Sequence, residues 1–150
     1  MQEAADERDR VVALYESEDF DLGATVNKAL DVLTRNPKGF FLMVESNNHF
    51  KDAKKSLSRL VAMDKVIRQV AERMANTGTL ILFTADHSYD LKISSASAPK
   101  VQDVTPYVVV GGHHTAEEVL VAAQGPGAEQ VHGFFPNTHL FHIMMRAYGW

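Results

Sequence analysis

Carboxylates and imidazoles follow three apolar stretches of this 150-residue sequence, each within five residues of the end of its stretch. The three pairs are Glu45 and His49, Asp86 and His87, and His113 and His114. Because the sequence contains no cysteine, aspartate, glutamate and neutral histidine are the ligands that a zinc site in this chain would use. If the three stretches end at one edge of a sheet, these residues predict a divalent-metal site.

Two of these pairs also have a plainer interpretation. Asp86 and His87 could be a turn acid beside a capping or surface histidine. Glu45 could end a strand or pair with a nearby lysine, and His49 could be an isolated surface-loop histidine. The metal interpretation is favoured because the polar residues occur together, and no single residue carries it.

The remaining histidines are assigned more narrowly. Adjacent side chains point in different directions, so we expect only one of His113 and His114 to bind metal. An alternative for the following stretch is a helix over residues 115–119, capped by its first threonine. His139 and His142 lie in the last predicted helix, where packing or the helix surface explains them. His132 has no assigned role.

The elements that must position the candidate ligands alternate between strand and helix. Short apolar runs predict strands over residues 11–15, 40–44, 79–84 and 105–110. Apolar residues at helical spacing predict helices over residues 25–35, 54–76 and 137–148. The run at 40–44 is continuously apolar, which predicts a strand buried on both faces.

Repeated strand, helix, strand units predict a mostly parallel sheet with helices on both faces, a three-layer α/β sandwich. In open sheets of this kind, ligands bind at the carboxyl ends of the strands, where the candidate ligands lie. With 45% hydrophobic and 23% charged residues, the chain is expected to form one globular domain over residues 1–150.

Composition and charge argue against several partners. The net charge is -4 and the pI about 5.9, whereas nucleic-acid binding needs clustered lysine and arginine. No run reaches transmembrane length, and the first ten residues are polar and acidic, unlike a secretory signal. We therefore expect neither nucleic acid nor membrane as a partner, while the lack of cysteine leaves the redox compartment open.

Four blocks of the sequence resemble the alkaline phosphatase family and occur in the family's order. They are residues 38–45 (KGFFLMVE), 84–88 (TADHS), 114–119 (HTAEEV) and 125–127 (GPG). Together they span most of residues 30–148. The resemblance implies an alkaline-phosphatase-like sandwich, of which this chain is the C-terminal portion and therefore an incomplete copy.

The resemblance also implies a role for each candidate ligand. Glu45 matches the family's magnesium ligand, while Asp86 and His87 match ligands of one zinc. His114 matches a ligand of the other zinc, and His49 looks like a second imidazole for that same ion. The implied cofactors are therefore Zn²⁺ and Mg²⁺.

Two departures from the family pattern matter. The family places an aspartate zinc ligand between the glutamate and the histidine, where this sequence has Ser46, Asn47 and Asn48. A neutral amide oxygen binds zinc less well than a carboxylate, and whether Asn47, Asn48 or Asp52 replaces the acid stays open. The family's metal-bridging aspartate and its serine or threonine nucleophile would both precede Met1, so no catalytic residue is assigned here.

The resemblance implies a metal-dependent phosphomonoester hydrolase that works through a covalent phosphoenzyme, with this chain expected to be inactive alone. One alternative is another hydrolase of the same superfamily, such as a phosphodiesterase or sulfatase. A second is a noncatalytic module for metal binding or protein association. The complete protein is expected in the periplasm or outside the cell, and exposed sheet edges would allow a homo-oligomer.

Overall fold

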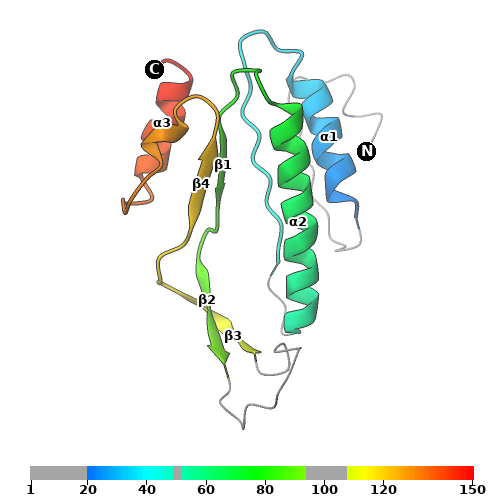
Figure 1. The fold of residues 1–150 in the computed structure, drawn as a ribbon, viewed down its shortest axis with the longest axis vertical. Helices are drawn as coiled ribbons and strands as arrows, with labels where there is room; N and C mark the ends of the chain where they lie inside the picture. Colours follow the sequence, from blue (N-terminus) through cyan, green and yellow to red (C-terminus); the bar gives the residue numbers. More distant parts are fainter. Residues whose placement is uncertain (1–19, 49–51, 94–107) are drawn as a thin grey trace.

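A computed structural model of the chain describes residues 20–48, 52–93 and 108–150 (Figure 1). The elements in chain order are α1 (Leu22–Leu33), α2 (Ala53–Arg73), β1 (Ile81–Thr84), β2 (Ser88–Ile93), β3 (Val108–Thr115), β4 (Val121–Gln124), the 3-10 helix η2 (Ala128–Gln130) and α3 (His139–Ala147). No helix within these described ranges is long and apolar enough to cross a bilayer.

Most of the predicted elements are confirmed. The helices predicted over residues 25–35, 54–76 and 137–148 form α1, α2 and α3. The strand predicted over residues 79–84 forms β1, which begins two residues later than expected. The strand predicted over residues 11–15 lies outside the described residues.

The described strands form two separate antiparallel pairs, β1 with β4 and β2 with β3. Figure 1 shows the chain running out through β1 and β2 and returning through β3 and β4. A parallel pair needs a crossover, usually a helix, and the described residues between β1 and β4 contain no helix. The mixed α/β composition is therefore confirmed, whereas the mostly parallel sheet is not found among the described strands.

Strand β3 overlaps the strand predicted over residues 105–110 and continues to Thr115. His113 and His114 therefore lie inside a strand, and the expectation that they follow its end is wrong. The alternative of a helix over residues 115–119 is also wrong. Thr115 ends the strand, and residues 116–119 have no helical structure. The ladder extends this far because Ser88 of β2 pairs with Thr115.

The prediction of a strand over residues 40–44 is wrong in two respects. Residues 40–46, called the 40–46 segment below, join no ladder with any described strand. Every second side chain packs inward, whereas Phe41 and Met43 are 61% and 74% exposed. Only one face is therefore covered, and no strand among the described residues pairs with this backbone.

The main core lies between α1, α2 and the 40–46 segment, which Figure 1 shows running alongside α2. Val26, Leu30 and Met74 form its buried centre. The partly buried residues packed against that centre are Leu22, Phe40, Leu42, Val44, Val66, Val70 and Ile81. At the end of this segment nearer α3, the Tyr148 hydroxyl donates a hydrogen bond of 2.6 Å to the Phe40 carbonyl oxygen.

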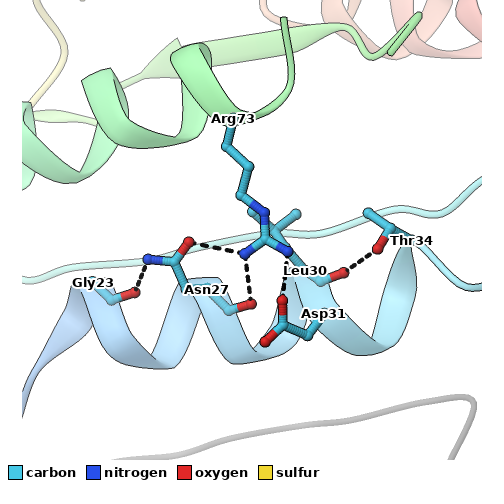
Figure 2. A network of polar contacts seen from close by, with 6 residues as sticks. All are labelled: Gly23, Asn27, Leu30, Asp31, Thr34 and Arg73. Carbon is cyan, nitrogen blue, oxygen red and sulfur yellow. Dashed lines mark hydrogen bonds and ion pairs between the residues drawn. The ribbon is translucent and has the colours of Figure 1, made fainter.

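Arg73 joins the two long helices outside the core (Figure 2). Its Nη1 donates to the carbonyl oxygen and to Oδ1 of Asn27 at 3.1 and 3.0 Å. Its Nη2 lies 2.5 Å from Oδ1 of Asp31. One guanidinium on α2 therefore contacts two successive turns of α1. The side-chain amide nitrogen of Asn27 donates in turn to the Gly23 carbonyl oxygen at 3.0 Å.

Candidate metal centre

The link between β1 and β2 carries Asp86 and His87. Strand β1 ends at Thr84 and β2 begins at Ser88, so both residues lie beyond the carboxyl end of an apolar strand, as predicted. The Asp86 side chain is 80% exposed and that of His87 is 27% exposed. An accessible carboxylate beside a half-buried imidazole can meet an ion that arrives from solvent.

His114 reaches the same place from β3. It pairs with Tyr89 in the β2–β3 ladder, and its ring stacks on that of His87 with centroids 3.6 Å apart and planes 19° from parallel. The Tyr89 ring meets both imidazoles edge-on, with centroid distances of 5.2 Å in each case. Cross-strand pairing therefore brings together two histidines that are distant in sequence.

The two ring nitrogens of His87 have different partners. Nδ1 lies 3.1 Å from the Ser88 carbonyl oxygen, and Nε2 lies 3.1 Å from Oδ2 of Asp86. A hydrogen on Nδ1 would donate to that carbonyl and leave the lone pair of Nε2 facing the carboxylate, which is a tautomer suited to metal binding.

The spacing of these two atoms bears on whether zinc would fit. Two ligands of a tetrahedral zinc lie about 3.3 Å apart when each bond to the metal is about 2.0–2.1 Å. The separation of 3.1 Å between Asp86 and His87 is close to that value. A protonated Nε2 would give the same separation as an ion pair, so the donor set fits zinc without requiring it.

The stack of His87 and His114 limits how a metal could be shared. Imidazole lone pairs lie in the plane of the ring, and two stacked rings with centroids 3.6 Å apart and planes 19° from parallel do not direct their lone pairs to one point. Consistent with this, no group of three or more acidic or histidine side chains within the described ranges is arranged to hold a single ion. Asp86 and His87 can bind the same ion. The lone pairs of the stacked His114 ring are not directed to that ion.

The structure brings together Asp86, His87 and His114, three of the five predicted ligands. Glu45 lies in the 40–46 segment with an exposed side chain, and His49 is outside the described residues. His113 is exposed and, by strand alternation, points away from the face that carries His114. His114 is therefore the ligand candidate of that adjacent pair.

Asp52, a candidate for the missing zinc carboxylate, has another role in the structure. It is the N-cap of α2, and its Oδ1 accepts hydrogen bonds from the backbone nitrogens of Lys54 and Lys55 at 2.9 and 3.2 Å. Such a cap contributes about 1 kcal/mol to helix stability. Moving Asp52 to a metal would expose those amides again, so the structure gives no support for the substitution.

Sequence reasoning missed Tyr89. Residues two apart on a strand face the same side, so His87 and Tyr89 at the start of β2 could have been grouped from spacing alone. The ring of Tyr89 limits the positions that both imidazoles can take. It is therefore a positioning residue for the candidate site.

A further polar group lies beside the histidines at the end of β3. The Thr115 hydroxyl beside Glu117 is the largest influence on that carboxylate and lowers its pKa, and the Ser88 hydroxyl adds a smaller effect in the same direction. Thr115 Oγ1 is buried and makes no regular hydrogen bond with the described residues, so it acts on Glu117 as a nearby dipole. Glu117 itself is exposed.

The comparisons with known proteins support the family resemblance, and the family model includes the first two sequence blocks. The alkaline phosphatase family model matches residues 15–109, which is more than half of the chain. The chain belongs to the alkaline phosphatase family.

Individual relatives are similar over most of this chain. The tissue-nonspecific alkaline phosphatase isozyme of Rattus norvegicus is 29% identical over 86% of the chain. The alkaline phosphatase of Escherichia coli K12 is 29% identical over 85%, and the streptomycin-6-phosphate phosphatase of Streptomyces griseus is 31% identical over 86%. These alignments cover 35%, 32% and 35% of the relatives, so the chain spans about a third of their length.

Proposed function

We propose that the chain is part of a metal-dependent phosphomonoester hydrolase of the alkaline phosphatase type. In this proposal Asp86 and His87 hold one zinc, and His114 holds a second. Glu45 is assigned to magnesium, and His49 is a further imidazole for the second zinc. The complete protein would have the three-layer sandwich with a mostly parallel sheet and would work in the periplasm or outside the cell.

The single observation that supports this proposal best is the stacked histidine pair. The rings of His87 and His114 have centroids 3.6 Å apart and planes 19° from parallel, whereas two-metal hydrolases use separate ligands for two neighbouring ions. Parallel in-plane lone pairs at that spacing suit two neighbouring ions better than one. The names of the relatives, two alkaline phosphatases and a streptomycin-6-phosphate phosphatase, support phosphate monoesters as the substrate class.

The chain's own residues would hold and orient the ions. The Ser88 carbonyl oxygen would favour the His87 tautomer with its hydrogen on Nδ1, and Tyr89 would limit the rotation of both rings. A pair of ions, when bound, stabilises the attacking and leaving oxygens of a phosphoryl transfer. The proposal assigns no nucleophile among these 150 residues, and we expect no turnover from the chain by itself.

A noncatalytic metal-binding module is the second candidate, and Asp52 is the observation that favours it. Asp52, the carboxylate considered for the missing zinc ligand, is used as the cap of α2. The second zinc would then be held by imidazoles with no acid, and a zinc at Asp86 and His87 would be the main ion. Such a module would bind about one zinc per chain and show no turnover in any larger assembly.

Zinc content after metal loading and dialysis tests the proposal. We expect the wild-type chain to retain zinc and the double variant Asp86→Ala, His87→Ala to retain at least one ion fewer per chain. His113→Ala is the matched control, because His113 is an exposed histidine of β3 that faces away from the site. An aryl phosphate monoester serves in parallel as the test substrate.

The possible outcomes separate the hypotheses. Zinc retained equally by folded wild-type and double-variant protein would refute the assigned ligands. Turnover by the wild-type chain would show that it carries a nucleophile that we have not identified. Retention of two zinc ions per chain favours the hydrolase centre, whereas a single ion favours the noncatalytic module.

A further inference from the structure

The ladder between β2 and β3 contains an irregularity next to the candidate metal centre. The paired residues on its two sides are Leu91 with Val110 and Tyr89 with His114. Between these pairs β2 has one residue, Asp90, whereas β3 has the three residues 111–113. A bulge of this kind bends its strand and changes where the following side chains point, and bulges are common beside functional sites. The first residue after this bulge is His114.

Gly111 lies against Asp90 at the beginning of the bulge. A Cβ on Gly111 would be 2.7 Å from the Asp90 Cβ and 2.8 Å from the Asp90 carbonyl oxygen. Neither of these atoms moves when the Asp90 side chain rotates, so a side chain at position 111 would force the strands apart. Asp90 is held further by an ion pair with Lys92, at 2.9 Å between Oδ2 and Nζ. The strands can approach this closely only because position 111 has no side chain.

The neighbouring glycine, Gly112, has different surroundings. A Cβ on Gly112 would meet no atom within 4 Å, and both Gly112 and His113 are exposed. We therefore assign Gly112 and His113 as the extra residues that leave the ladder, while Gly111 stays beside Asp90. The same substitution at the two glycines should have different consequences, because only Gly111 is close to the partner strand.

We propose that Gly111 is a positioning residue of the candidate metal centre. Its close approach to Asp90 fixes β3 against β2 on one side of the bulge, and the pairing of Tyr89 with His114 fixes it on the other. The His114 ring is thereby held where it stacks on His87. The consequence for zinc rests on the proposed function, whereas the placement of the ring does not.

Gly111 should matter for only one of the two proposed zinc ions. Asp86 and His87 precede β2, so their positions do not depend on how β3 continues past the bulge. His114 follows the bulge in β3 and does depend on it. A side chain at position 111 should therefore weaken the ion at His114 and spare the ion at Asp86 and His87, whereas unfolding of both strands and their links would release both ions.

Zinc titration of Gly111→Ala tests the positioning role. We expect the dissociation constant of one zinc to rise at least about tenfold and that of the other to stay unchanged. Gly112→Ala is the matched control, because it adds the same methyl group one residue away with no atom in reach, and it should change neither constant. Loss of both ions from Gly111→Ala, or equal effects of the two variants, would overturn the proposal.

A measurement without metal separates this inference from the proposed function. Proton NMR of the metal-free chain should show a nuclear Overhauser contact between the rings of Tyr89 and His114, whose centroids lie 5.2 Å apart. Gly111→Ala should weaken this contact and Gly112→Ala should preserve it. An unchanged contact in Gly111→Ala would overturn the inference whether or not zinc binds. Loss of the contact in a chain whose wild type binds no zinc would support the positioning role and refute the proposed function.

Deletion of Gly112 together with His113 covers the case in which Gly111→Ala unfolds the sheet. The deletion removes the two extra residues, leaves Gly111 beside Asp90, and places His114 opposite Tyr89 in a regular ladder. We expect the contact between the Tyr89 and His114 rings to persist in this variant. Its loss would show that the bulge places His114 and that Gly111 does not, which would overturn the proposal.

Discussion

Gly125 shows how strongly a single residue can be fixed by its backbone surroundings. Its φ is +100°, and a Cβ at this position would lie 2.1 Å from the Thr79 carbonyl oxygen. Because the obstacle is backbone next to β1, no side-chain rotation relieves it. We predict that Gly125→Ala lowers the free energy of unfolding by at least about 2 kcal/mol, as measured by urea titration.

Gly112→Ala is the control for this prediction. Gly112 has no positive φ, and a Cβ there would meet no atom within 4 Å. Its replacement should change stability by less than about 0.5 kcal/mol. Similar losses of stability at the two positions would mean that the result reflects the general cost of replacing glycine. The close approach to Thr79 would then not explain it.

Residue-level reasoning predicted part of the candidate site. The position of Asp86 and His87 beyond an apolar strand could be predicted, because the end of an apolar run is a local signal. That His87 would meet His113 or His114 was predicted from strand ends at one sheet edge, but the antiparallel pairing of β2 with β3 that brings them together was not. The choice of His114 came from the family resemblance. The engagement of Asp52 in capping α2 could have been predicted from its place just before an amphipathic helix.

At the scale of elements, Arg73 is the side-chain link between α1 and α2 that is drawn in Figure 2. Its guanidinium makes two hydrogen bonds to Asn27 and a charged contact with Asp31. The side chains of Arg73 and Asp31 are 32% and 51% exposed, which weakens the charge interaction through solvent screening. We predict that Arg73→Ala costs about 1 kcal/mol of unfolding free energy, as measured by chemical denaturation.

Arg68→Ala is the matched control on the same helix. Arg68 pairs with Asp64 at 3.8 Å, and both side chains are at least 70% exposed. A surface pair of this kind contributes about 0.3–0.5 kcal/mol, so its loss should be smaller than that of Arg73. A larger effect at Arg68 would show that the contacts with α1 do not stabilise the chain.

The helices were predicted more accurately than the strands for a physical reason. A helix makes its hydrogen bonds within one stretch of sequence, so the apolar period of α2 was sufficient to place it. The same period did not show which part would be covered, and Leu57, Leu60 and Val61 remain exposed near its beginning. Strands need partners elsewhere, and the apolar run at 40–44 has none among the described elements.

At the scale of the whole molecule, two structural units differ in how they are held. The α1, α2 and 40–46 unit contains the buried cluster of Val26, Leu30 and Met74, whereas none of the β2–β3 side chains whose burial the structure describes is buried. Segments with few buried contacts open more easily than the core. We predict that, without zinc, backbone amides of β2 and β3 exchange with solvent at least about tenfold faster than those in the middle of α2.

Zinc should change this ranking if the candidate centre binds it. The ligands lie where β2 begins and β3 ends, so an ion held there adds free energy that opening of the pair must overcome, about 2.7 kcal/mol at a hundredfold excess over the dissociation constant. Hydrogen exchange measured with and without zinc should therefore slow in β2 and β3 and stay unchanged in α1. The Asp86→Ala, His87→Ala variant should show no such slowing. Slowing throughout the chain, or in the variant as well, would place the zinc elsewhere.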